Sequence, residues 1–180
     1  MQLVTTDPFP PLFTRAKRRA FHCETRDSYL VDDEVESLRR FLAGEPPLPP
    51  PDTWHAWRAL MTETTGRGVA VQRVRVVTVP HSDYVRWLLS TTANGDLGLH
   101  EDIRWLPRHL AESLPVPLDD WWLFDDELLA YNVNDADGAA AGIAVTEDPL
   151  VTSVYGPVRD QLWDRAIPHE DYIRSEHTQV

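Results

Sequence analysis

Residues 69–106 read VAVQRVRVVTVPHSDYVRWLLSTTANGDLGLHEDIRWL, and they predict the centre of the fold. The run from Val69 to Val79 is too short and too rich in β-branched residues for a helix, which is typical of a buried strand. Pro80 ends this strand, and the apolar residues from Tyr84 to Leu89 then recur at helical spacing. Ile103 begins a second short strand. Strand, helix and strand in this order predict a parallel pair with the helix on one face of a sheet.

The segment after residue 106 predicts further strands of the same sheet. Two apolar runs around Asp125-Asp126 are typical of a β-hairpin, and Asp135-Ala136-Asp137-Gly138 predicts a second turn. Asp148-Pro149, an N-cap followed by proline, begins a long C-terminal helix. We therefore expect an α/β fold with flanking helices and a mixed sheet built on Val71–Val79, Ile103–Leu106, Trp121–Phe124, Leu128–Val133 and Ala140–Val145.

The N-terminal part of the chain predicts helices. Apolar residues at 12, 13, 16, 20 and 21 have helical spacing with basic residues between them, so we expect an amphipathic helix there. Residues 24–29 are expected to be extended, and Asp32 or Asp33 caps a second helix that ends at Gly44. The prolines of residues 46–51 can neither continue a helix nor pair inside a sheet. The expected organisation is an N-terminal helical subdomain (1–45), a polyproline connector (46–51), an α/β core (52–174) and a disordered tail (175–180).

The composition limits the classes of partner. The 180 residues are enough for one domain that buries its own core. Acidic residues outnumber basic ones 29 to 17, and the net charge of −12 opposes direct binding to nucleic acid or to an anionic membrane. The single cysteine, Cys23, excludes an internal disulfide. Because the sequence has neither a signal peptide nor an apolar run of transmembrane length, we expect a cytoplasmic protein without membrane contact.

A resemblance to a known family rests on three segments taken together. These are residues 24–29 (ETRDSY), residues 75–104 with their Pro80, Ser82-Asp83-Tyr84 and Arg86-Trp87, and residues 120–126 (DWWLFDD) with the later Trp163, Ala166, Pro168-His169 and Tyr172. They resemble an actinobacterial family of domains of unknown function, whose members often lie beside helix-turn-helix regulators or in specialised-metabolism clusters. The resemblance implies a regulatory or accessory protein with such a regulator, or another protein, as its partner.

The order of the expected elements is also similar to one half of the phospholipase-D-like fold. Catalytic members of that fold carry the motif His-x-Lys-x4-Asp, in which the histidine attacks phosphorus and the lysine neutralises the phosphoryl oxygens. With Asp125 as the motif aspartate, the histidine and lysine positions hold Leu118 and Asp120; with Asp126, they hold Asp119 and Trp121. Neither alignment supplies a nucleophile or a cation, so the resemblance implies a degenerate fold that binds or senses.

Acid/base candidates gather near the second strand. His100, Glu101 and Asp102 follow Gly95 and Gly98, at the mouth of that strand, where the loops of an α/β sheet often line a ligand crevice. With Asp120, His100 and Glu101 are the candidates for catalysis in an enzyme of small-molecule metabolism; a polar loop is the alternative interpretation.

Metal and cofactor sites have little support. His22, Glu24 and Asp27 could supply metal ligands, but the seven histidines show no spacing typical of a metal-binding helix. The glycine-rich nucleotide motifs are absent as well. We therefore expect no metal and no cofactor.

Arginines alternate with aromatic residues and predict a different kind of site. Arginine binds carboxylate or phosphate groups through two N–H groups, and the turn after Pro80 offers a helix N-terminus. Internal salt bridges with the acidic residues are the alternative. The expected ligand-binding set for a small anion is Arg26, Tyr29, Ser82, Tyr84, Arg86 and Arg104. From these observations we expect a non-catalytic regulatory or accessory module that binds a partner protein or a small anionic ligand.

Overall fold

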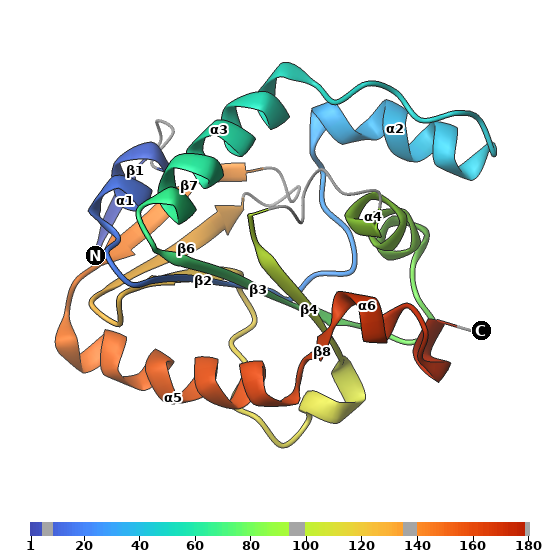
Figure 1. The fold of residues 1–180 in the computed structure, drawn as a ribbon. Coiled ribbons are helices and arrows are strands. Elements are labelled where there is room, and N and C mark those ends of the chain that lie inside the picture. The colour runs from blue at the N-terminus through green and yellow to red at the C-terminus, as the bar shows by residue number, and fades with distance from the viewer. Residues whose placement is uncertain (5–8, 94–99, 135–139, 179–180) are drawn as a thin grey trace.

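The fold is built on one mixed sheet, whose strands are spread along the sequence from residue 2 to residue 168 (Figure 1). The computed structural model describes residues 1–4, 9–93, 100–134 and 140–178. The strands are β1 Gln2–Val4, β2 Arg19–Glu24, β3 Ala70–Val77, β4 Asp102–Pro107, β5 Trp121–Phe124, β6 Leu128–Asn134, β7 Ala140–Thr146 and β8 Ile167–Pro168. The helices are α1 Phe9–Arg15, α2 Asp32–Leu42, α3 Asp52–Gly66, α4 Asp83–Ala93, α5 Pro149–Arg165 and α6 His169–Tyr172, with the 3-10 turns η1 Arg108–Ala111 and η2 Glu176–Thr178.

The predicted centre of the sheet is confirmed. The strand order is β1-β7-β6-β5-β2-β3-β4-β8, so β3 is an interior strand. Strand β3 pairs in parallel with β4, and α4 connects the two, as the strand-helix-strand pattern predicts. Strands β5, β6 and β7 form the expected antiparallel extension. The hairpin turn uses Asp125 and Asp126 at φ values of 53° and 67°, a left-handed conformation that aspartate tolerates better than most residues. The turn predicted at 135–138 and the glycines 95 and 98 lie outside the described residues.

The helix predicted over residues 12–21 is wrong in its second half. Helix α1 ends at Arg15, and β2 begins at Arg19 between β5 and β3. The Asp125 carboxylate accepts hydrogen bonds from the backbone N–H groups of Lys17, Arg18 and Arg19 at 2.7, 2.8 and 2.8 Å, which turns the chain from helix into strand. This contact comes from a hairpin far away in the sequence.

The first residues of the chain are therefore part of the sheet and not of a separate helical subdomain. Strand β1 pairs with β7, and β2 pairs with both β3 and β5. The boundary expected at residue 45 does not separate the N-terminal residues from the core. Residues 46–51 do connect two helices, α2 and α3. The tail also differs from the expected disorder, since residues 176–178 form η2.

The two faces of the sheet are covered differently. Helix α5 covers one face, where Val74, Leu106 and Trp121 pack against Leu162 (Figure 1). On the other face, α1 and α3 cover one half, and α2, α4 and α6 cover the other half. Charged side chains lie on this second face, between its two apolar clusters. In the described part of the chain no helix is long and apolar enough to cross a membrane.

Candidate functional site

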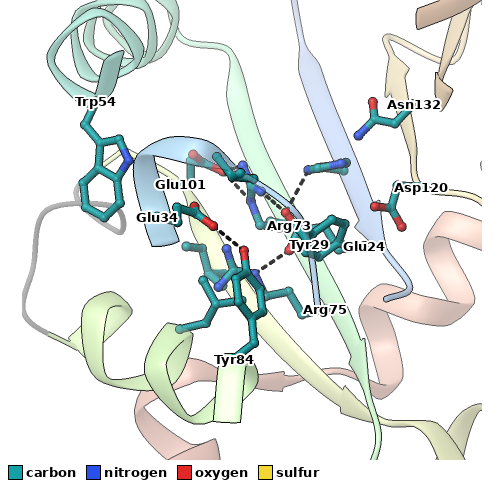
Figure 2. Close-up of a pocket in the computed structure, with 14 residues that line it drawn as sticks. Glu24, Tyr29, Glu34, Trp54, Arg73, Arg75, Tyr84, Glu101, Asp120 and Asn132 are labelled. Carbon is teal, nitrogen blue, oxygen red and sulfur yellow. Dashed lines mark hydrogen bonds and ion pairs between the residues drawn. The ribbon is translucent and has the colours of Figure 1, made fainter. Parts of the chain in front are cut away.

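A cavity of about 200 Å³ lies on the sheet face between the two groups of helices (Figure 2). Strands β2 and β3 form its floor, and residues from the segment after β2, from α2, α3, α4 and from the β5–β6 side form its walls. The polar and aromatic lining residues are His22, Glu24, Arg73 and Arg75 on the floor, and Tyr29, Glu34, Trp54, Tyr84, Glu101, Asp120 and Asn132 around it.

The strand register places the floor residues on one face. His22 lies opposite Arg73, and Glu24 lies opposite Arg75 in the parallel pair of β2 and β3. Side chains two residues apart on a strand point to the same side, so all four reach the cavity. The residues between them, such as Cys23 and Val74, point into the core under α5.

The floor is a buried ion network with balanced charge. The Glu24 carboxylate accepts from Arg73 and, at 2.5 Å, from Arg75 Nε. Arg73 Nη2 also lies 2.8 Å from Glu101 Oε2, and the other oxygen of Glu101 accepts from Trp57 Nε1 at 2.8 Å. Burial alone would raise the pKa of Glu24, but Arg75 and Arg73 hold that pKa far below its usual range. Two arginines and two glutamates thus neutralise one another.

Two further carboxyl groups have no arginine of their own. Tyr84 donates its hydroxyl to Glu34 Oε2 at 2.5 Å. Asp120 Oδ1 accepts from the backbone N and the hydroxyl of Thr25 at 2.7 and 2.9 Å. Burial raises the pKa of both carboxyl groups, and the charge of Glu24 raises that of Asp120 further. When ionised, Glu34 and Asp120 carry negative charge that the arginines of the cavity do not balance.

Several buried polar atoms at the cavity have no hydrogen-bond partner in the described structure. They are both ring nitrogens of His22, Nη1 of Arg75 and Oδ1 of Asn132. His22 is 5% exposed, and its ring stacks on Trp122 at 4.2 Å. Burial and then Arg73 lower the pKa of His22, so its imidazole is neutral at pH 7, although Nδ1 lies 3.5 Å from Glu24 Oε1. Buried polar groups are nearly always paired in folded proteins, so these atoms indicate a place where a ligand or water binds.

The structure brings together only part of the site predicted from sequence. Tyr29, Tyr84, Glu101 and Asp120 line the cavity. His100 does not line it, and its Nε2 lies 3.0 Å from Thr62 Oγ1.

The arginines expected to bind an anion do not converge. Arg86 is exposed and pairs with Asp83 at 3.0 Å. Arg104 points to the opposite face of β4, where its guanidinium lies 3.7 Å from the Trp163 ring centre. Arg26 does not line the cavity either. Of the set expected to bind an anion, Tyr29 and Tyr84 therefore line the cavity, whereas its three arginines do not.

Ser82 has a structural role that explains its position. Its hydroxyl accepts from the backbone N of Val85 at 3.1 Å and donates to the Asp27 carbonyl at 2.6 Å. It thus caps α4, as an N-terminal serine often does.

The sequence interpretation considered His22 and Glu24 only as metal ligands and did not join them with Arg73 and Arg75 into one site. Arg73 and Arg75 stand two residues apart in a strand whose other residues are apolar apart from Gln72, and His22 and Glu24 have the same spacing. Charged residues at alternate positions of a buried strand are a signal for one shared polar site, because such groups are buried only when paired. No group of three or more His, Cys, Asp or Glu among the described residues is arranged to hold a metal ion.

Replacing Asp120 with asparagine should raise the free energy of unfolding by about 1 kcal/mol, the scale of a single stabilising substitution. Asparagine keeps an oxygen for Thr25 but removes a buried charge whose pKa is raised in the folded state. Ionisation of a carboxyl whose pKa is raised by folding destabilises the folded protein. The gain in unfolding free energy from Asp120→Asn should therefore be full near pH 7 and should vanish below the usual aspartate range. Urea unfolding at both pH values measures this. The exposed neighbour variant Asp119→Asn should change stability by less than about 0.5 kcal/mol.

Solved structures resemble this chain in fold. NucT from Helicobacter pylori has a TM-score of 0.50 at 10% identity, over 88% of this chain and 87% of that one. Nuc from Salmonella typhimurium, a phospholipase D family member, has a TM-score of 0.49 at 11% identity, over 88% and 86%. TrmBL2, an archaeal chromatin protein described with a novel mode of DNA binding, has a TM-score of 0.47 at 10% identity, over 92% of this chain and 53% of its own. This chain thus spans about half the length of TrmBL2.

The likeness to NucT shows the class of fold. The mixed sheet with flanking helices is phospholipase-D-like, as the order of elements predicted. No curated protein matches the sequence. A family model matches residues 7–174, and the chain therefore belongs to the family described as a domain of unknown function, DUF6879.

Proposed function

We propose that this chain is a non-catalytic module that binds a small polar molecule in the cavity above β2 and β3. The observation that carries this proposal is the set of buried, unpartnered polar atoms on His22, Arg75 and Asn132 around one cavity. Leaving such atoms without partners costs about 1–3 kcal/mol each, a cost that a bound ligand would remove.

Two observations support a non-catalytic role. The charged groups of the floor are engaged with one another, and both oxygens of Glu101 are taken by Arg73 and Trp57. Neither expected alignment with His-x-Lys-x4-Asp supplies a histidine or a lysine. The charges also argue against the anionic ligand expected from sequence, because Glu24 and Glu101 already neutralise the arginines of the cavity.

A partner protein would transmit the bound state. The net charge of −12 opposes a direct role at nucleic acid, so any effect on gene expression would pass through a partner such as a helix-turn-helix regulator. A cytoplasmic, accessory role beside such a regulator is part of this proposal.

An enzyme of small-molecule metabolism is the second candidate. One observation favours it: Asp120 lies in the cavity beside Tyr29, with its pKa raised by burial and by Glu24. Carboxyl groups of this kind serve as acids or bases in many enzymes.

A pair of tryptophan substitutions, one at the N-cap of α2 and one within α2, tests the proposed function. Val31 lines the cavity at the start of α2, whereas Val35, one turn later, is 60% exposed and does not line it. Val31→Trp should fill the cavity without removing any of its polar groups, and Val35→Trp is the matched control. A small-molecule extract of the host cells is passed over each immobilised protein, and the retained compounds are identified by mass spectrometry.

The wild-type protein and Val35→Trp should retain a common compound at least about tenfold more strongly than Val31→Trp does, the factor that 1.4 kcal/mol of binding represents. Recovery of that compound unchanged supports the binding module. Its recovery in chemically altered form would favour the enzyme. Equal retention by all three proteins would contradict both, because binding would not depend on the cavity.

A further inference from the structure

We propose that the ligand of this cavity carries a protonated amine, which Asp120 and Asn132 bind at one end of the cavity. This inference rests on the proposed function and names the chemical class of its ligand. It also replaces the small anion expected from sequence with a cation.

The charges of the cavity wall favour a cation. Four carboxyl groups, those of Glu24, Glu34, Glu101 and Asp120, face the two guanidinium groups of Arg73 and Arg75. Glu24 and Glu101 are bound to the arginines. Within the described structure, Glu34 and Asp120 have no such cation. An anionic ligand would add to this excess, whereas an ammonium group would offset part of it.

The acceptor atoms are concentrated around Asp120. The backbone N of Asn132 donates to the carbonyl of Asp120 at 2.9 Å, and Figure 2 shows the two side chains next to each other, across the site from Glu34 and Tyr84. Asn132 Oδ1 is buried without a hydrogen-bond partner in the described structure. A carboxylate has about four acceptor positions, and Thr25 fills two of those on Asp120. An ammonium group has three N–H donors and no acceptor, which suits these two oxygens.

His22 is independent evidence that a ligand enters here. It is 5% exposed, lines the cavity and has no hydrogen-bond partner on either nitrogen within the described residues. A neutral imidazole has one acceptor nitrogen, which can take a further N–H of the amine. Arg75 Nη1 remains as a donor for an acceptor atom elsewhere on the ligand.

The size and the walls of the cavity limit the rest of the ligand. A cavity of about 150 Å³ is known to hold benzene, so the about 200 Å³ found here has room for one ring with a short chain. Tyr29, Trp54 and Tyr84 line the walls, and aromatic rings attract organic cations. The class is therefore a small organic amine of about this size.

Three probes of one shape but different charge test the inference. Phenethylamine is a cation at pH 7, 2-phenylethanol is neutral and phenylacetate is an anion. Titrations of the full chain, followed by NMR, should show the amine binding at least about tenfold more tightly than the alcohol, and the acid binding more weakly than the alcohol. Asp120→Asn should weaken amine binding by about 10- to 100-fold and change alcohol binding by less than about threefold, because only the charged hydrogen bond is lost.

Asp119→Asn is the matched control, since it removes the same charge from the exposed neighbouring residue and should leave amine binding unchanged. An equal loss in both variants would overturn the inference, because the effect would then be that of net charge. Tightest binding of phenylacetate, or no binding of the amine, would overturn it too. If the amine fails this comparison but 2-phenylethanol or phenylacetate binds the wild-type protein and not Val31→Trp, the cavity remains a ligand site and only the amine assignment fails. The proposed function itself fails only if no compound from the cell extract depends on the cavity.

Discussion

Replacing Glu24 with alanine should lower the free energy of unfolding by about 3–5 kcal/mol, because it leaves buried arginines without their shared carboxylate. Arg73 and Arg75 have side chains only 12% and 8% exposed, and both bind Glu24. Urea unfolding followed by tryptophan fluorescence measures the loss. The pKa of Glu24 is lowered in the folded state, so its contribution is present above the usual glutamate range and is lost as the pH falls. The cost of the substitution should therefore shrink in acid.

Glu36→Ala is the matched control for this prediction. Glu36 also binds an arginine, Arg39, at 2.8 Å, but both side chains are more than half exposed. Solvent screens such a pair, so its loss should cost less than about 1 kcal/mol. Equal costs for Glu24→Ala and Glu36→Ala would contradict the burial of the ion network.

The core of the fold could be predicted because its signals are local. The β-branched run of β3, the helical spacing of α4 and the Asp125-Asp126 turn each lie within a short segment. Successive side chains on a strand point to opposite faces, so Trp121 and Trp122 must lie on different sides of the sheet. Trp121 packs in the cluster under α5, and Trp122 packs in the cluster with α1 and α3.

Strand β2 could not be predicted in the same way. Its apolar residues fit a helix as well as a strand, and the decisive contacts come from distant parts of the chain. The Asp125 carboxylate that turns the chain into β2 lies 108 residues after Lys17. Strand β2 then pairs with β3 about 50 residues later, and no local pattern contains that information.

The site was predicted only in part, because the sequence does not show on which face of the sheet each arginine lies. The sequence interpretation placed the arginines at the strand ends, where Arg86 proves exposed and Arg104 points to the other face. A shift of one residue on a strand changes the face of the sheet, so Arg104 is excluded from the cavity although its neighbour Ile103 lines it. Glu101 and Asp120, both candidates from the sequence, line the same cavity, but the sequence could not show that Glu101 is bound on both oxygens.

Replacing Glu101 with alanine should also cost about 3–5 kcal/mol of unfolding free energy. Its side chain is 2% exposed, and it joins Arg73 of β3 to Trp57 of α3. The substitution leaves both a buried guanidinium and an indole N–H without their partner. Glu63→Ala is the control. Glu63 lies on α3, the helix that carries Trp57, and it pairs with Arg67 at 3.2 Å at the surface, so its loss should cost less than about 1 kcal/mol.

Glu101→Gln separates a structural role from a catalytic one. Glutamine keeps an oxygen for Trp57 but loses the charge that Arg73 requires, so we expect a loss of about 1.5–3 kcal/mol in unfolding free energy. The part that stays folded should still bind the cavity ligand, because neither oxygen of Glu101 is free to touch a ligand. A catalytic acid or base behaves in the opposite way, since its amide variant keeps the fold and loses turnover. A stable Glu101→Gln protein that converts no compound, beside a wild-type protein that does, would assign the chemistry to Glu101 and contradict the structural role.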